Sequence, residues 1–154
     1  MLPELVASLA SGIFFGAALY INLVEHPARM SCGMSLAVTE WRPSYKRGTL
    51  MQAPLALMGS VAALIAWWLR GSTAWLIGGL LLLFVVPFTL TVILPTNRLL
   101  ESQELNSRSE EAARLLRRWG WLHAVRTVLS GVAFFVFLLI LIADHGNSQY
   151  LNGR

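Results

Sequence analysis

The stretch TAWLIGGLLLLFVVPFTLTVIL, residues 73–94, carries no charged side chain. At a rise of about 1.5 Å per residue, a helix of this length crosses a hydrocarbon core of about 30 Å. The short turn Arg70-Gly71-Ser72 separates this stretch from a second charge-free run at 49–69. So short a connection leaves room only for an antiparallel hairpin of two helices. The middle of the chain therefore predicts a pair of membrane-spanning helices.

Two further apolar runs flank this predicted hairpin. Leu5–Val24 precedes it, and Thr127–Ala143 follows it as part of a helix expected to begin near residue 120. A membrane helix satisfies its own backbone hydrogen bonds, as the hydrocarbon core demands. We therefore predict an all-α fold, a four-helix transmembrane bundle in one membrane domain over residues 1–143. The expected spans are about 5–24, 49–69, 73–94 and 120–143, followed by a polar C-terminal tail at 144–154.

The composition of the whole chain agrees with a lipid environment. Of its 154 residues, 56% are hydrophobic and 13% are charged, which is about half the charged fraction of an ordinary soluble domain. A soluble enzyme and a disordered segment are thereby excluded. The net charge is only +4, without a basic stripe of interleaved aromatic residues, so no nucleic-acid partner is expected. The single cysteine excludes an internal disulfide and a cysteine-based zinc site.

The distribution of basic residues predicts the orientation of the bundle. Most lie in the two longer connections, and the opposite side has only Arg70 and Arg154. Because positive charge favours the cytoplasmic side, we expect a multi-pass protein of the cell (cytoplasmic) membrane with both long loops in the cytoplasm and both termini outside. The residues behind this bias are Arg29, Arg42, Lys46, Arg47, Arg98, Arg108, Arg114, Arg117 and Arg118.

The two cytoplasmic connections differ in character. The first, Glu25–Gly48, is predicted as a long loop in which Thr39 caps a helix and Pro43 lies in its first turn. The second contains Ser107-Arg108-Ser109-Glu110, a capping-box pattern. Apolar residues follow this pattern at helical spacing. They predict an amphipathic helix before the fourth span, lying at the interface or running directly into that span.

Ionisable and amide side chains gather at the cytoplasmic end of the predicted bundle. Such groups at membrane depth are costly and commonly mark functional sites. Asn22, Glu25 and His26 share one helix face at the end of the first span, and His123 and Arg126 lie together at the start of the fourth. The candidate site residues are Glu25, His26, Trp41, Tyr45, Arg47, Asn97, His123 and Arg126.

Two kinds of catalytic site are consistent with these residues. In the first, His26 and His123 bind a transition metal, iron or copper, with Glu25 as a third ligand. In the second, the site has no metal: His26 or His123 acts as a general base, and Arg126 and Asn97 hold an oxyanion or enolate. The sequence leaves the cofactor open between these two.

The remaining candidates, Trp41, Tyr45 and Arg47, are predicted to bind substrate together with Asn97. Tyr45 and the tryptophans would stack on an aromatic molecule that enters from the membrane. Simpler roles stay open for two of them. Trp41 fits an interfacial aromatic belt, and Arg47 fits a contact with lipid phosphate or a determinant of topology.

Five short motifs together resemble a known family. In order along the chain they are GAALY (16–20), VEHP (24–27), WRPSYKR (41–47), LPTN (94–97) and WLHAVRT (121–127). Their order and spacing around four spans are similar to those of the anthrone-oxygenase-like integral membrane family. The resemblance runs from about Leu9 to Phe137. It implies a four-span bundle, and it carries over to the motif residues His26, Trp41, Tyr45, Arg47, Asn97, His123 and Arg126.

For the fungal polyketide members of this family, the reaction that the resemblance implies is oxidation of an anthrone to an anthraquinone by oxygen. The leading hypothesis is therefore a membrane oxidoreductase, an oxygenase acting on a lipophilic aromatic, anthrone- or quinol-like substrate. The alternative is a non-catalytic membrane protein, either an accessory subunit or a small-solute carrier. The expected partners are the lipid bilayer and a lipophilic small molecule. Gly12 and Gly16 form a small-xxx-small pair that would serve a homodimer or packing within the chain.

Overall fold

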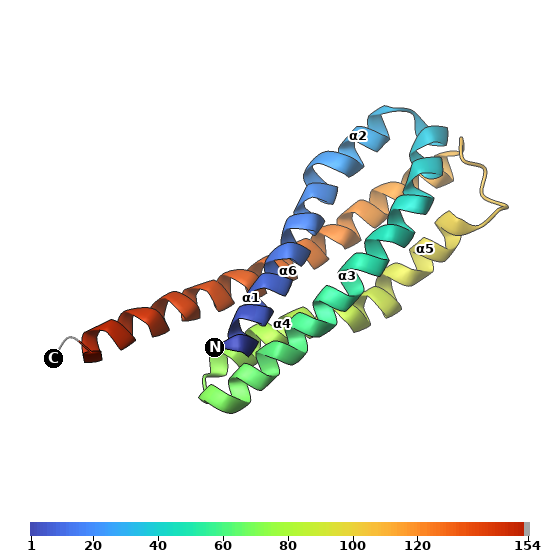
Figure 1. Ribbon diagram of the computed structural model, residues 1–154. Coiled ribbons are helices and arrows are strands. Elements are labelled where there is room, and N and C mark those ends of the chain that lie inside the picture. The colour runs from blue at the N-terminus through green and yellow to red at the C-terminus, as the bar shows by residue number, and fades with distance from the viewer. Residues whose placement is uncertain (153–154) are drawn as a thin grey trace.

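A computed structural model describes the backbone of residues 1–152 and the side chains of residues 1–144. Its described residues form helices and short connections (Figure 1). The elements in chain order are α1 (Leu2–Tyr20), η1 (Ile21–Glu25), α2 (His26–Ser31), α3 (Met34–Arg70), α4 (Thr73–Phe88), η2 (Thr89–Ile93), α5 (Leu94–Glu101) and α6 (Glu110–Asn152). The segments η1 and η2 are single turns of π-helix, so α1–η1–α2 and α4–η2–α5 are each one continuous rod.

Four long helices form the bundle, and all four are long and apolar enough to cross a membrane. The rods led by α1 and α4 each pack against both α3 and α6, which places α3 and α6 diagonally across the bundle. Large apolar side chains cover the outside, among them Leu9, Trp68 and Leu139. Outward apolar side chains on every helix require lipid around the protein. The predicted all-α transmembrane bundle is confirmed, and the chain is a multi-pass membrane protein.

Small residues allow the helices to approach closely, as is usual in membranes. A Cβ atom on Gly78 would lie 2.3 Å from the ring of Phe137, and one on Gly12 would lie 2.9 Å from the ring of Phe134. Gly12 therefore packs against α6 within the chain. A Cβ on Gly16 would meet nothing within 4 Å. The homodimer stays a prediction.

The predicted long first loop is wrong. Helix α2 follows the first span without a break, and only Cys32 and Gly33 separate it from α3. Gly33 makes this turn with a φ of 89°, a value that favours glycine. The sequence prediction ended the span at its charges, but Arg29 is buried and ion-paired with Glu25 and Glu40. Paired charges need no solvated loop, so the helix continues through them.

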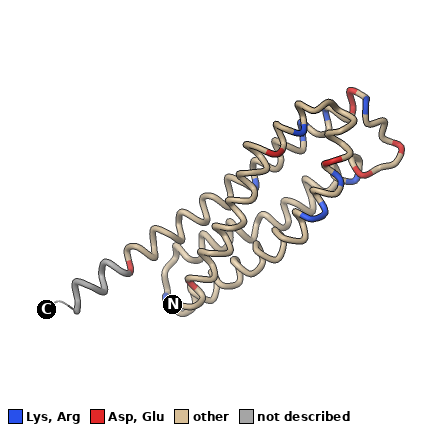
Figure 2. The backbone as a smooth tube through the Cα atoms, turned by 45° about the horizontal axis from the view of Figure 1, so that its top comes forward, with Lys and Arg blue, Asp and Glu red and all other residues tan. Residues whose placement is uncertain are grey.

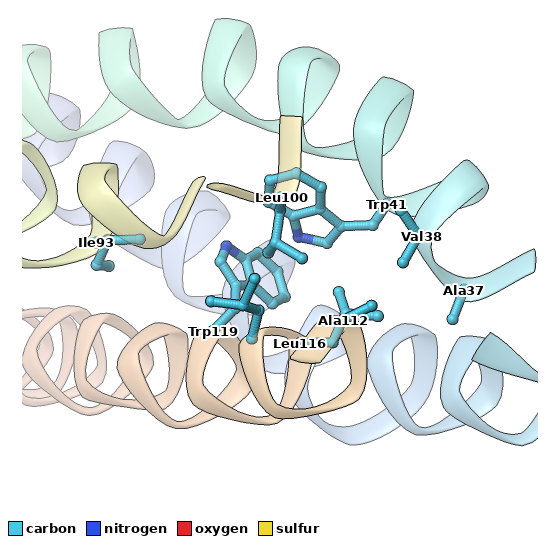
Figure 3. Packing of buried hydrophobic residues seen from close by; sticks show 9 residues of the cluster. Ala37, Val38, Trp41, Ile93, Leu100, Ala112, Leu116 and Trp119 are labelled. Atoms are coloured by element: carbon cyan, nitrogen blue, oxygen red, sulfur yellow. The ribbon is translucent and has the colours of Figure 1, made fainter. Parts of the chain in front are cut away.

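The amphipathic segment before span four is the first part of α6 itself. The Oγ of Ser109 accepts a hydrogen bond from the backbone N–H of Ala112 at 3.1 Å, which caps the helix at its start. From Glu110 the helix runs directly into the membrane span. Its apolar face is covered by α3 and α5, as the buried cluster around Trp41, Leu100 and Trp119 shows (Figure 3).

Charged residues concentrate at the end of the bundle that carries α2, α5 and the start of α6 (Figure 2). We call this end of the bundle the charged end. At the opposite end, Glu4 of α1 accepts a hydrogen bond from Nε of Arg70 at 2.6 Å. The polar tail expected at 144–154 lies almost wholly outside the residues with described side chains. Backbone helix α6 continues to Asn152.

Candidate functional site

Each of the two π-helical turns lies just before a proline. Pro27 follows η1 by two residues, and Pro95 follows η2 by two residues. A proline has no N–H to donate to the carbonyl four residues earlier, and its ring crowds that carbonyl. Those carbonyls belong to Leu23 and Thr91, inside the π turns. The wider turn accommodates the proline, and π turns are frequent at functional sites.

The first π turn carries Asn22, which ties α1 to α6. Its Nδ2 donates to the carbonyl of Gly120 at 3.1 Å. Its Oδ1 accepts from Oγ1 of Thr127 at 2.7 Å and lies 2.7 Å from Nδ1 of His123. Because Nδ2 is held by a carbonyl, Oδ1 must be the atom that faces His123, and it can only accept. This network assigns the proton of a neutral His123 ring to Nδ1 and leaves Nε2 as an acceptor or base.

A small cavity of about 20 Å³ lies beside this histidine, between η1, α3 and α6. It has room for about one water molecule. His123 and Arg126 line it from α6, and Tyr45 and Gln52 line it from α3. The other lining residues are Ile21, Glu25, Ser44, Gly48, Thr49 and Trp119. We call it the His123 cavity.

Arg126 is a buried cation that has no carboxylate partner among the side chains of residues 1–144. Only 9% of it is exposed, and its Nη2 donates to Oε1 of Gln52 at 2.8 Å. Its guanidinium lies 5.4 Å from the ring centroid of Phe14. Among the described side chains, no Asp or Glu forms an ion pair with it, and its Nε has no hydrogen-bond partner. A buried, incompletely paired guanidinium is suited to an oxyanion.

This geometry can now be compared with known proteins. The family model described as anthrone oxygenase matches residues 41–136, more than half of the chain. The chain belongs to the anthrone oxygenase family. The matched part includes the residues that α3 and α6 contribute to the His123 cavity.

A curated member of the family shows a weaker similarity over nearly the whole chain. Anthrone oxygenase dmxR16 of Cryptosporiopsis sp. (strain 8999) is 24% identical over 148 residues, which cover 91% of this chain and 86% of that protein. No solved structure matches the chain. The comparisons therefore support an anthrone-oxygenase-like membrane protein, consistent with the four apolar helices.

Within this anthrone oxygenase family member, the predicted site residues fall into separate places. His123, Arg126 and Tyr45 meet at the His123 cavity, and Glu25 lies at its rim. Arg47 lines an open groove of about 520 Å³ on the neighbouring surface between the first rod and α3. The groove shares Ile21, Glu25, Ser44 and Gly48 with the cavity.

Trp41 and Asn97 line neither the His123 cavity nor the open groove. Trp41 is fully buried, stacked on Tyr45 at 4.9 Å between ring centroids and packed edge-on against Trp119 at 5.8 Å. Asn97 is also fully buried, and its amide atoms have no hydrogen-bond partner among the described residues. Neither lines the His123 cavity.

The second histidine, His26, lies behind Trp119. Its ring centroid is 5.3 Å from that of Trp119, and the ring centroid of His123 is 4.9 Å from that of the same tryptophan. Its Nε2 lies over Gly120, where a Cβ would approach to 2.6 Å. His26 is not among the residues that line the cavity.

The side chains predicted to bind a metal are not arranged as a metal site in this structure. Within residues whose side chains are described, no group of three or more His, Cys, Asp or Glu lies in a metal-binding arrangement. Glu25 is instead engaged by Arg29 and by the hydroxyl of Ser44. The three candidate ligands Glu25, His26 and His123 are therefore not gathered around one point.

Three contributors to the site were missed or left without a role by the sequence prediction. Asn22 was noted for its position, but its bond to His123 depends on the π turn. The sequence prediction misses Gln52 because it locates this span by the absence of charged residues. An amide at membrane depth is itself a signal of a functional site. The hydroxyl of Thr127 donates a hydrogen bond to Asn22, and Thr127 does not line the His123 cavity.

Proposed function

We propose that this protein is a membrane oxygenase that oxidises a lipophilic aromatic substrate with an anthrone- or quinol-like oxygen. The reaction takes place at the His123 cavity. One observation carries the proposal: the incompletely paired Arg126 guanidinium lies beside a histidine whose Nδ1 is held by Asn22. A base and an oxyanion-binding group thus share one buried cavity. Family membership supports the same reaction class.

The chemistry for an anthrone uses these two groups in turn. Nε2 of His123 removes a proton from the methylene carbon opposite the ketone. The resulting enolate oxygen is held by Arg126, whose fixed positive charge stabilises the anion. Molecular oxygen adds to the electron-rich carbon, and loss of water leaves a second ketone. One oxygen atom stays in the product and the other leaves as water, so the four-electron oxidation of CH₂ to C=O balances the reduction of O₂.

The proposed roles of the other residues follow from their places. Gln52 orients Arg126 through its 2.8 Å hydrogen bond. Tyr45 and Trp119 provide aromatic surface at the cavity wall. Arg47, in the open groove, contacts lipid headgroups or polar substituents. His26 packs behind Trp119 and supports the wall of the site.

We also propose that the charged end faces the cytoplasm, in the cell membrane. The basic residues of both connections lie at that end (Figure 2), and positive charge near span ends favours the cytoplasmic side. Both termini would then lie outside. The substrate site would be in the cytoplasmic half of the bilayer.

Comparing the two histidines tests the reaction. Purified protein is supplied with anthrone in oxygenated buffer, and the anthraquinone formed is measured above the rate without protein. His123→Gln is expected to lower turnover by about 10²–10⁴-fold, the usual contribution of a general base. His26→Gln is expected to keep turnover within a few-fold of wild type. Thermal melting in detergent checks that both variants are folded.

The outcomes separate the candidate functions. A folded His123→Gln protein with wild-type turnover would contradict the proposed base. A loss of turnover in His26→Gln alone would identify His26 as the base, on the other side of Trp119 from His123. A wild type that oxidises neither anthrone nor a quinol would favour the non-catalytic accessory or carrier function.

A further inference from the structure

A second, apolar cavity reaches the same arginine from the other side. It has a volume of about 110 Å³ and lies between α3 and the α4–η2 rod. Arg126 and Thr49 line both this cavity and the His123 cavity, so the two meet at the guanidinium. The remaining lining residues are Phe14, Ala53, Ala56, Val85, Val86, Thr89 and Leu90. We call it the α3–α4 slot.

The slot leads from the lipid-facing surface to the bundle interior. Leu90 and Ala53 at its outer part are exposed on the membrane-facing side of the helices. Phe14 and Ala56 at its inner part are buried. Side chains as small as Ala53 and Ala56 leave space between two neighbouring helices. An apolar molecule dissolved in the bilayer could reach this gap without passing through water.

Two threonine hydroxyls on the α4–η2 rod beside the slot already have hydrogen-bond acceptors. The hydroxyl of Thr89 donates to the carbonyl of Val85 at 2.7 Å, and that of Thr91 donates to the carbonyl of Pro87 at 2.8 Å. These hydrogen bonds satisfy backbone carbonyls near Pro87 and the π turn η2, which have no water to bind in the hydrocarbon core. The walls therefore favour a hydrocarbon surface, and the unpartnered Nε of Arg126 at the inner end favours an oxygen.

From this placement we propose that the α3–α4 slot is the substrate's binding site for its ring system, entered sideways from the bilayer. A flat, fused aromatic molecule slides end-on between α3 and α4, so that its ketone oxygen reaches Arg126 and the methylene carbon across the central ring faces the His123 cavity. The slot is open on the lipid side, so it needs to enclose only part of the rings. Ala53 and Ala56 set the thickness of molecule that is accepted. This inference rests on the proposed function, in which Arg126 holds the ketone oxygen and His123 removes a proton from the methylene carbon.

The groove on the other side completes the arrangement. It lies between the first rod and α3, carries Glu40 and Arg47, and meets the His123 cavity at Glu25 and Ser44. The reaction site at the His123 cavity thus lies between an apolar entrance, the slot, and a polar groove. An aromatic substrate would enter by the first, and water formed in the reaction would leave by the second.

The test narrows the slot at its outer part while leaving the proposed base and Arg126 in place. Ala53→Trp and Leu90→Trp are compared with Val61→Trp, a matched control on the exposed surface of α3 that lines none of these cavities. Proteins are reconstituted in lipid nanodiscs. Two readouts are taken: kcat/KM for anthrone, and the Kd of anthraquinone from equilibrium dialysis. Using two slot variants guards against one that fails to fold.

We expect both slot variants to lower kcat/KM for anthrone and to raise the Kd of anthraquinone, each at least tenfold, with Val61→Trp unchanged. Slot variants that match Val61→Trp in both readouts would overturn the inference and leave the proposed reaction standing. A wild type without turnover, whose anthraquinone binding is still lost in the slot variants, would support the slot as a site for flat aromatic ligands and refute the oxidation. Absence of binding in the wild type would overturn the slot directly.

Discussion

Asn22 shows how much of the site depends on one amide. Its Oδ1 is the acceptor that keeps the proton of a neutral His123 on Nδ1, while its Nδ2 is anchored on the carbonyl of Gly120. Without this acceptor the ring is free to rotate or to change tautomer, and Nε2 is no longer fixed as the unprotonated nitrogen of the ring. Asn22 is thus a positioning residue that acts through the histidine.

Replacing this amide gives a prediction at the residue scale. Asn22→Ala should lower kcat for anthrone about ten- to a hundredfold, because a lost buried hydrogen bond costs roughly 1–3 kcal/mol. KM should change little. Asn22→Asp keeps the acceptor for Nδ1 and should recover part of the rate with a shifted pH profile. Equal rates and pH profiles in the wild type and both variants would show that Asn22 only joins α1 to α6.

The same residues show what a sequence can and cannot provide at this scale. His123 and Arg126 were identified because charges at membrane depth are conspicuous in any apolar run. Trp41 and Asn97 belong to the same motifs, but both are buried and neither lines the cavity. Motif membership does not tell which way a side chain points. The pairing of Gln52 with Arg126 joins the diagonal helices α3 and α6, and only the packed bundle reveals such a contact.

At the scale of elements, the packing of the His26 side chain against α6 rests on Gly120. A Cβ there would lie 2.6 Å from Nε2 of His26, closer than atoms can pack. Gly120→Ala should therefore destabilise the protein by about 1–3 kcal/mol, the usual range for overpacking. Gly16→Ala is the matched control, because a Cβ at Gly16 meets nothing within 4 Å. Alanine favours the helix, so this control should melt no lower than wild type.

Thermal melting in one detergent compares these two glycine variants. A Gly120→Ala protein that melts like Gly16→Ala would mean that His26 moves aside freely. The contact between α2 and α6 would then contribute little to stability, and the wall behind Trp119 would be less rigid than the structure indicates.

The helix boundaries illustrate why elements were harder to predict than their number. Four spans follow from hydropathy alone. The break between spans one and two was placed at Glu25 because charges were expected to lie in water. Buried pairing of Arg29 with Glu25 and Glu40 removes that reason, and the π turn before Pro27 lets the helix pass the proline. The pairing depends on how α2 and α3 pack against each other, and the π turn is a local response to Pro27; hydropathy registers neither feature.

At the scale of the whole molecule, the orientation in the membrane is open to a direct experiment. Cys32, the single cysteine, is exposed in the turn between α2 and α3 at the charged end. A membrane-impermeant maleimide should label it only after cells are permeabilised, because this end is proposed to face the cytoplasm. Ser72→Cys, in a Cys32→Ser background, places the reporter in the turn between α3 and α4. It should be labelled in intact cells.

The opposite labelling pattern would invert the proposed topology. The site would then lie in the outer half of the bilayer, and the basic residues of the charged end would need another explanation. Labelling of both turns in intact cells would point to chains inserted in two orientations.

The central claim is that His123 and Arg126 promote the reaction of molecular oxygen with an aromatic substrate. Anthrone oxidation under ¹⁸O₂ tests it most directly, with the anthraquinone product analysed by mass spectrometry. The account predicts one ¹⁸O atom in the new ketone, formed by wild-type protein well above the rate without protein, and loss of that excess in His123→Gln. Product formed at the same rate by folded His123→Gln, or product that forms only at the protein-free rate, would contradict the account.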